Sequence, residues 1–535
     1  MVAAHGETEP LLANTIRDVR VPRTSRSRKL LVFLVCSVLI LAVDFGFFMA
    51  AAPQTAVFEE IICRNHGLQP RSSNGTSGGL DPCKSELVQG ELALVLGYKD
   101  TFDTLPGQFG APSDDFFDVT ADGVGILLLL PFGILSDRWG RKPVLYLACL
   151  GLVLSEMWVR TVCYFSDYLP IRMIWLSALW RMIGGGEQVA TNTCFVMIAD
   201  IFSEEERSGA LFRLQACALA AEILATPLSA YLMTFNPAFP YVLGLVIIVV
   251  GFLPIVLLPE TLEDAKATRL SQLQPNSNAA NSEPDIEPTE VLDKAMLPEL
   301  IRQIREFIES TQFIWRDLNV SLLVLTMFVW AVSRQSTNLL LQYASKKFHW
   351  SIARASLLIS LRGIFQLVNF LVLMPTLTFL AATYYNLHGK HRDYRLSQGS
   401  GLLSIVGFAA MGLAPVPVLL ICGLVFLSLG SAFSTTTRSL VTSLVVPDHV
   451  GTLYSAIGIS QSVGTFIAGP LFAYLFKLGM HLGNAWMGLP FLQASLFYVI
   501  ATVAVWRVRI GRSTSDDAEE PLESESMYTS VDLRP

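Results

Sequence analysis

The chain has 535 residues, of which 52% are hydrophobic and 16% are charged, and its formal net charge is −7. A soluble domain typically has about 25% charged residues, so too few charges are present here to cover a soluble surface of this size. The composition therefore excludes an ordinary soluble protein and indicates an integral membrane protein. The net charge carries little information, because the distribution of Lys and Arg among the loops matters more in a membrane protein.

Apolar runs of the length that crosses a bilayer, about 20 residues, recur along the whole chain. They predict an all-α integral membrane fold with about twelve transmembrane helices. The expected spans are Leu30–Pro53, Phe116–Leu135, Val144–Phe165, Ile171–Asp200, Ser208–Met233, Tyr241–Leu258, Val320–Leu341, Ala353–Leu380, Gly401–Pro415, Val418–Val441, Leu453–Leu478 and Met487–Val508.

The segment before the first span, residues 1–29, is polar and lacks the small-residue cleavage site of a signal peptide. Basic residues gather at its end, and also after the second, eighth and last spans. The positive-inside rule makes that side the cytoplasm, so the tails 1–29 and 509–535 are both expected there. The expected location is the plasma membrane, and the match of Glu7 to Leu12 to an acidic dileucine sorting signal makes a vacuolar or endosomal membrane the alternative.

Residues 54–115 are expected to form a long outer loop between the first two spans. Cys63 and Cys83 lie in it, with the sequon Asn74-Gly-Thr between them. On the non-cytoplasmic side the two cysteines either form a disulfide or remain free thiols of a mobile loop, and Asn74 is available for glycosylation. No cysteine or histidine spacing typical of zinc or haem is present, so neither a metal nor a cofactor is expected.

A hydrophilic island, GILSDRWGRK, separates the second and third expected spans. Its informative residues are Gly133, Asp137, Arg138, Gly140, Arg141 and Lys142. This pattern of glycines, Asp-Arg and Arg-Lys resembles the signature between the second and third spans of major facilitator superfamily (MFS) transporters. A generic positive loop is the alternative, but such a loop would not need the Asp and both glycines in register. The resemblance implies two six-helix pseudo-repeats, with the substrate site between them near the membrane midplane.

The fourth expected span contains a second similarity to the same family. Arg181 followed by Gly185 in LWRMIGGGEQ resembles a family signature whose arginine is implicated in proton coupling. The end of this span resembles the charged cluster that pairs with the island at the inner gate; the cluster is Asp200, Glu204 and Arg207. We therefore expect Asp137 and Arg141 to hold the inner gate closed, with Asp200 as their acidic partner.

Two details bear on the branch of the family. The Gly-Pro-rich signature of drug/proton antiporters in the fifth span is reduced here to Ala225-Thr-Pro227, which leaves drug export less supported than general solute transport. The cysteine-bearing outer loop and the acid in the fifth span are similar to the proton-coupled folate transporter family.

Ionisable residues inside the spans are the candidates for proton coupling or substrate binding, because each costs about 2.5–3.5 kcal/mol at the bilayer centre. They are Asp44, Glu156, Arg181, Glu187, Glu222, Arg334, Arg362 and Arg438. A carboxylate that is exposed alternately to each side can load and release a proton. For Glu156 the alternative is a static ion pair with Arg160, one helical turn away.

Residues 260–319 are expected to be a cytoplasmic linker between an N-terminal half, 30–259, and a C-terminal half, 320–508. The linker begins as a polar, disordered stretch and ends with apolar residues at helical spacing, as in amphipathic helices that lie against a membrane. The halves share short sequence repeats. Residues 225–232 match 468–475, and 186–193 parallel 430–437 at nearly the same offset.

The sequence thus predicts a secondary active transporter, expected to be monomeric, that moves a small organic solute across a lipid bilayer by alternating access with proton coupling. The alternatives are a drug or toxin efflux antiporter and a transporter-like receptor that does not transport. A primary pump is excluded because no phosphate-binding loop ending in Gly-Lys-Ser or Gly-Lys-Thr is present. No nucleophile pairs with a base, so an enzyme is not expected, and nothing indicates a nucleic-acid partner.

Overall fold

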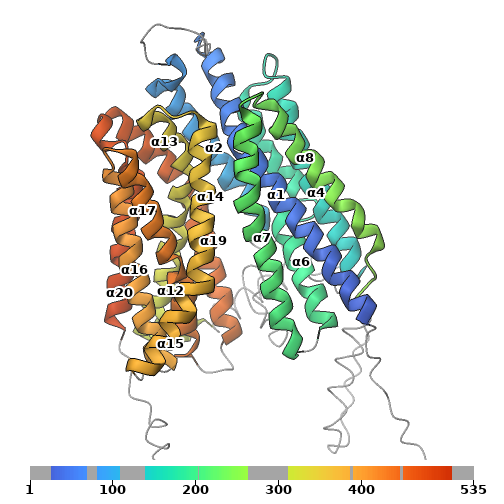
Figure 1. Ribbon diagram of the computed structural model, residues 1–535, viewed down its shortest axis with the longest axis vertical. Coiled ribbons are helices and arrows are strands. Elements are labelled where there is room, and N and C mark those ends of the chain that lie inside the picture. The colour runs from blue at the N-terminus through green and yellow to red at the C-terminus, as the bar shows by residue number, and fades with distance from the viewer. Residues whose placement is uncertain are drawn as a thin grey trace, which may run out of the picture.

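The protein consists of two groups of helices that lie side by side, as the computed structural model shows in Figure 1. The structure describes residues 26–68, 81–108, 136, 139–202, 204–262, 311–385, 389–445 and 450–508, and within these ranges every regular element is helical. The blue-to-green group comes from the N-terminal half of the chain and the yellow-to-red group from the C-terminal half (Figure 1).

The helices follow the apolar runs of the sequence. The N-terminal half contains α1 (Arg26–Asn65), α2 (Glu86–Gln108), α4 (Arg141–Tyr164), α5 (Ser177–Arg181), α6 (Gly186–Ile201), α7 (Glu204–Met233) and α8 (Ala238–Phe252). The C-terminal half contains α12 (Leu318–Gln335), α13 (Leu340–Phe348), α14 (Ile352–Val368), α15 (Met374–Tyr385), α16 (Gly389–Leu413), α17 (Pro417–Leu429), α18 (Phe433–Thr442), α19 (Val450–His481) and α20 (Leu489–Arg507). The short helix α11 (Gln312–Arg316) precedes α12.

Among the described residues, ten helices are long and apolar enough to cross a membrane. Many of their large apolar side chains, such as Leu41, Val250 and Val418, are exposed. A lipid environment accounts for this exposure, since lipid tails solvate such side chains as water does not. Of the expected spans, Phe116–Leu135 lies outside the described residues, and the fourth is divided into η2 (Ile171–Leu176), α5 and α6.

Residues 54–115 were expected to form a long outer loop, but much of this segment is helical in the structure. Helix α1 continues to Asn65, and α2 occupies residues 86–108 and packs against both α1 and α19. The sequence pattern did not predict α2 because its charged residues interrupt the apolar run. In the structure these charges have partners within the protein, so a buried helix can carry them.

Four of the long apolar segments are interrupted near their middle. The fourth breaks at residues 182–185 between α5 and α6; the seventh breaks at η5 (Ser336–Leu339) between α12 and α13; the tenth breaks at η7 (Gly430–Ala432) between α17 and α18. The eighth changes to the π-helical η6 (Asn369–Leu373) between α14 and α15. Broken helices expose backbone groups and side chains near the membrane midplane, where transporters bind their substrates. The fourth and tenth breaks adjoin the segments that repeat in sequence.

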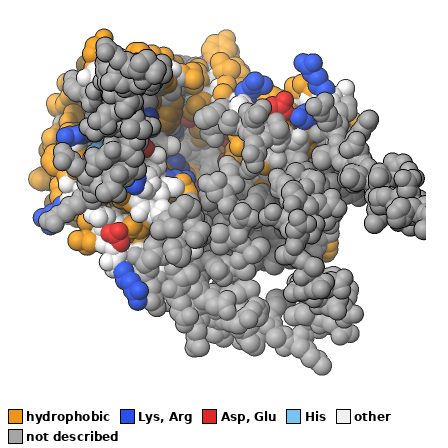
Figure 2. Space-filling model, turned by 90° about the horizontal axis from the view of Figure 1, so that it is seen from below, with side chains coloured by type: hydrophobic (Ala, Val, Ile, Leu, Met, Phe, Trp, Pro, Cys, Tyr) orange, Lys and Arg blue, Asp and Glu red, His pale blue; other side chains and the backbone are white. Residues whose placement is uncertain are grey.

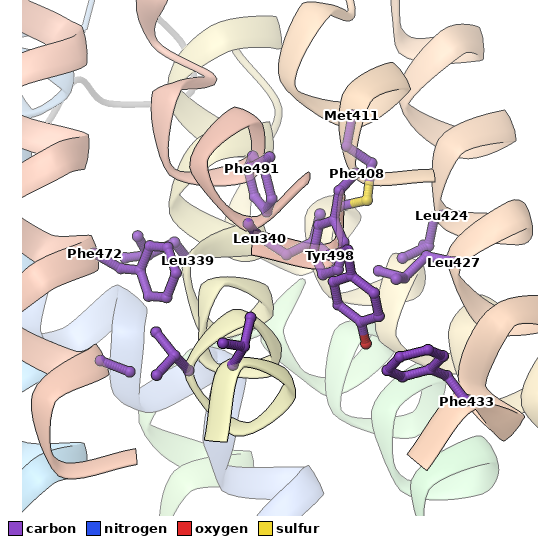
Figure 3. Close-up of a cluster of buried hydrophobic side chains, with 14 of the residues drawn as sticks. Leu339, Leu340, Phe408, Met411, Leu424, Leu427, Phe433, Phe472, Phe491 and Tyr498 are labelled. Carbon is purple, nitrogen blue, oxygen red and sulfur yellow. The ribbon is translucent and has the colours of Figure 1, made fainter. Parts of the chain in front are cut away.

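A large apolar core holds the C-terminal half together. Figure 3 shows Phe408, Phe433 and Tyr498 from three different helices lying close together, and the ring of Tyr498 is 5.4 Å from that of Phe408 and 5.5 Å from that of Phe433. Phe408 and Phe433 are almost completely buried. Burial of such aromatic side chains holds these three helices together.

Among the described residues, the two halves meet mainly along two helix pairs. Helix α2 packs on α19, and α7 packs on α14. Gly97 on α2 and Gly469 on α19 allow these two helices to approach closely, because a Cβ atom on Gly97 would lie 2.7 Å from the Gly469 carbonyl oxygen. Close backbone approach at small residues is a common way for membrane helices to associate.

We call the end near α13 the outer end and the end where α1 begins the inner end, following the orientation expected from the basic residues. Figure 2 views the inner end, where the visible described side chains include several Lys and Arg in blue and few acids in red. This bias fits a cytoplasmic inner end.

Candidate functional site

The N-terminal half contains a buried set of charges, which we call the N-half charge network: Lys99, Asp103, Glu156, Arg160 and Arg181. Arg181 lies 3.5 Å from Asp103 and 3.4 Å from Glu156. Lys99 bonds Asp103 at 2.5 Å, and Arg160 bonds Glu156 at 2.7 Å. The expected ion pair of Glu156 with Arg160 is therefore present, and Arg181 adds a second partner to Glu156.

The network joins four helices. Lys99 and Asp103 stand on α2, Glu156 and Arg160 on α4, and Arg181 on α5. The Arg160 guanidinium also donates to the carbonyl oxygen of Tyr241 on α8, at 3.1 and 3.0 Å. Because removal of one member would leave a buried charge without its partner, this network is well suited to hold the N-terminal half as one body.

Glu222 and Arg362 connect the two halves. The carboxylate of Glu222 on α7 accepts a hydrogen bond of 2.8 Å from the guanidinium of Arg362 on α14. Their side chains are 8% and 28% exposed, respectively. A charge pair that spans both halves near the middle of their helices must rearrange whenever the halves move apart.

Asp44 lies near Glu187 and Glu222, and neither Asp44 nor Glu187 has an ion pair or a side-chain hydrogen bond with the residues that the structure describes. Asp44 stands in the middle of α1, with Glu187 and Glu222 as its charged neighbours. Glu187 is in the first turn of α6, just after the break in the fourth span, and Arg181 is a charged neighbour. We call the three carboxylates of Asp44, Glu187 and Glu222 the acidic wall of the N-terminal half.

Arg334 and Arg438 occupy different levels of the C-terminal half. Arg334 lies in the last turn of α12, just before the η5 break, and has Glu222 and Arg362 as charged neighbours. Arg438 lies in the middle of α18, where it donates to the Gln461 amide oxygen at 3.3 Å and lies over the Tyr454 ring. Arg438 is therefore not part of the group around Glu222.

The outer end contains a second buried contact between the halves, which we call the outer latch: Glu59, Lys84, Gln89 and Ser345. The Lys84 ammonium bonds both Glu59 carboxylate oxygens at 2.6 and 2.8 Å, and donates to the Ser345 hydroxyl on α13 at 2.7 Å. Gln89 also donates to Glu59. The latch ties α1 and α2 to α13 at the outer end.

A disulfide supports the latch. Cys63 and Cys83 are joined, with their Cα atoms 5.2 Å apart, so the expected disulfide is confirmed. Cys83 belongs to the short helix η1 (Pro82–Lys84), which also contains Lys84. The bond thus fixes η1 to the end of α1. The expected glycosylation site Asn74 lies outside the described residues.

The inner end has a cluster around the start of α4, which we call the inner cluster: Arg141, Asp200, Glu260 and Thr261. Arg141 lies 3.4 Å from Asp200, which also accepts from the Thr261 hydroxyl at 3.2 Å. The Glu260 carboxylate accepts the backbone N–H of Arg141 at 2.8 Å and that of Lys142 at 3.1 Å. A carboxylate at a helix N-terminus compensates both the free N–H groups and the helix dipole.

Some expected gate residues cannot be placed. Gly133, Asp137 and Arg138 lie outside the described residues, as do the side chains of Glu204 and Arg207. Gly140 is described, with φ +106° and no room for a Cβ atom beside Glu260. The expected proximity of Arg141 and Asp200 is present, whereas Glu260 is a residue that the sequence pattern did not single out.

Glu260→Gln is expected to destabilise the start of α4 by about 1–2 kcal/mol, because it removes the charge that caps the free N–H groups. Thermal unfolding and amide hydrogen exchange of the first turn of α4 measure the effect. The matched control is Glu206→Gln, since Glu206 forms an exposed pair with Lys29 that is worth about 0–1 kcal/mol. Equal effects of the two substitutions would contradict a capping role for Glu260.

Comparison with known proteins agrees with this geometry. The family model described as Major Facilitator Superfamily matches residues 120–469. The MFS-type transporter avaK of Aspergillus versicolor is 32% identical over 91% of this chain and 94% of its own length. The efflux pump ustT of Aspergillus flavus is 32% identical over 90% of this chain and 89% of its own length. A proton-coupled folate transporter of Rattus norvegicus is more distant, at 25% identity over 71% of this chain and 74% of its own length.

A solved structure shows the same fold. The partially occluded inward-open form of the xylose transporter XylE from E. coli aligns with a TM-score of 0.53, covering 90% of this chain and 97% of that chain. The sequence identity of 14% limits this likeness to the fold alone. The family model and the relatives together show that the chain is a member of the major facilitator superfamily.

Proposed function

We propose that this multi-pass membrane transporter is a secondary carrier that exports a small organic solute by alternating access, in exchange for protons. Two observations support the direction and the mechanism. A relative of similar length is an efflux pump, and the two halves meet through charged groups at the middle of their helices. The observation that carries the proposal is the Glu222–Arg362 pair between the halves.

The chemistry of coupling follows from what Glu222 can bind. While the halves lie together, the Arg362 guanidinium neutralises the carboxylate. When the halves separate, a proton can replace Arg362 as the neutralising partner. Asp44 lies close to both Glu187 and Glu222, so a proton taken up by Asp44 reduces its repulsion with each of them. A proton carried on this acidic wall is released when Arg362 returns.

The outer latch fits one end of such a cycle. With Lys84 bound to Glu59 and Ser345, and with Gly97 against Gly469, the halves are joined at the outer end. In alternating access, this arrangement corresponds to a form from which solute exchanges with the inner side. Export requires the latch to open after the solute has bound.

Glu222→Gln and Asp44→Asn are each expected to abolish solute accumulation driven by a pH gradient, while exchange of solute across the membrane is partly retained. The substitutions remove the groups that bind the proton but leave the path between the halves in place. Proteoliposomes with an imposed pH gradient measure accumulation, and the same vesicles without a gradient measure exchange. An exported solute should accumulate in cells that lack the protein. Solutes found in this way are the candidate substrates for the vesicle assays.

Arg172→Gln is the control. Arg172 is exposed, and its ion pair with Glu91 is long, at 3.7 Å, so its loss should have little effect. Unchanged pH-driven accumulation in both acid variants would refute the assignment of the coupling residues. Binding of the solute without any flux in the unmodified protein would instead favour a transporter-like receptor.

A further inference from the structure

The C-terminal half has an unusual charge distribution. Residues 320–508 contain two acids, Asp393 and Asp448. Asp393 lies near the inner end of α16, where it accepts from the hydroxyl of Ser439 and pairs with Arg392. Asp448 lies outside the described residues. The arginines in the middle of this half therefore receive no carboxylate from their own helices.

Arg334 is one of these arginines, and it stands near the midpoint of the broken span Leu318–Phe348. Its side chain is exposed even though Glu222 of the other half is a charged neighbour. It forms no ion pair or side-chain hydrogen bond with any residue that the structure describes. An exposed cation at this depth and next to the opposite half borders a solvent-accessible space between the halves.

Arg362 is the second arginine, and its hydrogen-bonding capacity is only partly used. One terminal nitrogen donates to Glu222 at 2.8 Å. The Nε atom is buried and has no hydrogen-bond partner in the described part of the protein. We call Arg334 and Arg362 the arginine pair. Glu222 neighbours both guanidinium groups but pairs with Arg362 alone, so the charge of Arg334 has no ion pair within the described residues.

Such a charge is costly within the membrane unless an anion neutralises it. The aromatic ring of Trp330 provides a further element, because it lies 5.5 Å beneath the Arg334 guanidinium and packs against the apolar core. A planar guanidinium held over an aromatic ring presents its donors in a fixed fork that matches a carboxylate.

We propose that the arginine pair binds the anionic group of the transported solute, and that the substrate is therefore an organic acid with a carboxylate or a similar planar oxyanion. This inference rests on the proposed transport function. Arg334 binds the two oxygens, Arg362 adds a second positive charge beside it, and Trp330 supports the apolar body of the ligand. The acidic wall opposite repels the same anion when it carries no proton.

The test measures binding to the full-length protein in lipid nanodiscs, without any gradient. The probes are phenylacetate, cinnamate and hexanoate, each compared with its uncharged primary amide. At least one acid is expected to bind more tightly than its amide. Arg334→Gln should weaken that binding at least about tenfold, since hydrogen bonds to a charged group are lost, and Arg334→Lys should weaken it less because a point charge remains.

Arg354→Gln is the matched control. Arg354 also lies over a tryptophan ring, that of Trp350 at 4.7 Å, but it stands in the first turn of α14 at the outer end. Its substitution removes the same kind of stacking and should leave acid binding unchanged. Thermal unfolding of each variant checks that the fold is retained.

Three outcomes would overturn the proposal: no acid binds at concentrations up to about 10 mM, beyond the Kd of a weak ligand; the amides bind as tightly as the acids; or Arg334→Gln binds like the unmodified protein. These outcomes are independent of coupling. Acid-selective binding without flux would contradict only the transport function, whereas proton-coupled flux of an uncharged solute that is insensitive to Arg334 would contradict only the arginine site.

Discussion

Replacing Lys84 with Met is expected to open the outer end of the protein. The Lys84 ammonium is nearly buried between the Glu59 carboxylate and the Ser345 hydroxyl. Its removal leaves Glu59 as a buried charge without its cation, which costs about 3–5 kcal/mol, and also cuts the link to α13. The form that is closed at the outer end should therefore lose more than about 90% of its population, since 1.4 kcal/mol is a factor of ten.

A cysteine pair reports this change. Gly90 on α2 faces Lys477 on α19, and a Cβ on Gly90 would lie 3.4 Å from the Lys477 side chain. Cysteines at these two positions, in a protein whose six free cysteines are replaced by Ala, should cross-link only while the outer end is closed. Lys84→Met should reduce the rate of cross-linking at least about tenfold.

Two further variants separate closure from stability. Ser345→Ala keeps the ion pair but removes its contact with α13, so it should slow cross-linking without lowering the unfolding temperature much. Glu59→Gln combined with Lys84→Met removes the unpaired charge, and should restore the unfolding temperature but not the cross-link. Full cross-linking in Lys84→Met would show that the latch does not hold the halves together.

Gly469→Leu is expected to prevent closure by a different route. A Cβ atom at this position would collide with the backbone of Gly97 and with the Thr101 side chain. Backbone atoms of a packed helix cannot move aside as a flexible side chain can, so α2 and α19 must separate. We expect solute flux to fall below about a tenth of the normal rate, because the cycle lacks its outer-closed form.

Gly458→Leu is the control for this prediction. Gly458 stands on the same helix, α19, and a Cβ atom there would meet no other atom within 4 Å. The added side chain should leave flux and cross-linking near normal. If Gly458→Leu and Gly469→Leu behave alike, close approach of α2 and α19 is not required for transport.

The sequence was sufficient for those parts of the fold that depend on apolar length. Long runs such as those in α1 and α20 must be helical in a bilayer, because only helices and closed barrels satisfy their backbone there. Helix α2 was not recognised, because Lys99, Asp100 and Asp103 resemble the residues of a loop. Their spacing contained a signal, since Lys99 and Asp103 are one helical turn apart.

The candidate site was only partly predictable for a related reason. An ionisable residue within a span can be found from the sequence, and Glu222 and Arg362 were both found in this way. Their pairing joins residues 140 positions apart, and nothing local in the sequence specifies it. Glu260 was missed because it stands outside the spans, where an acid is ordinary, and its role arises only from the folding of its segment against the start of α4.

The disulfide has a consequence for the stability of the outer latch. Cys63 and Cys83 are 20 positions apart, and closing a loop of that size in advance saves about 3 kcal/mol of chain entropy. The bond holds the helix that contains Lys84 against the end of α1, which contains Glu59. Reduction of the bond is therefore expected to loosen the outer latch, although none of the latch residues changes.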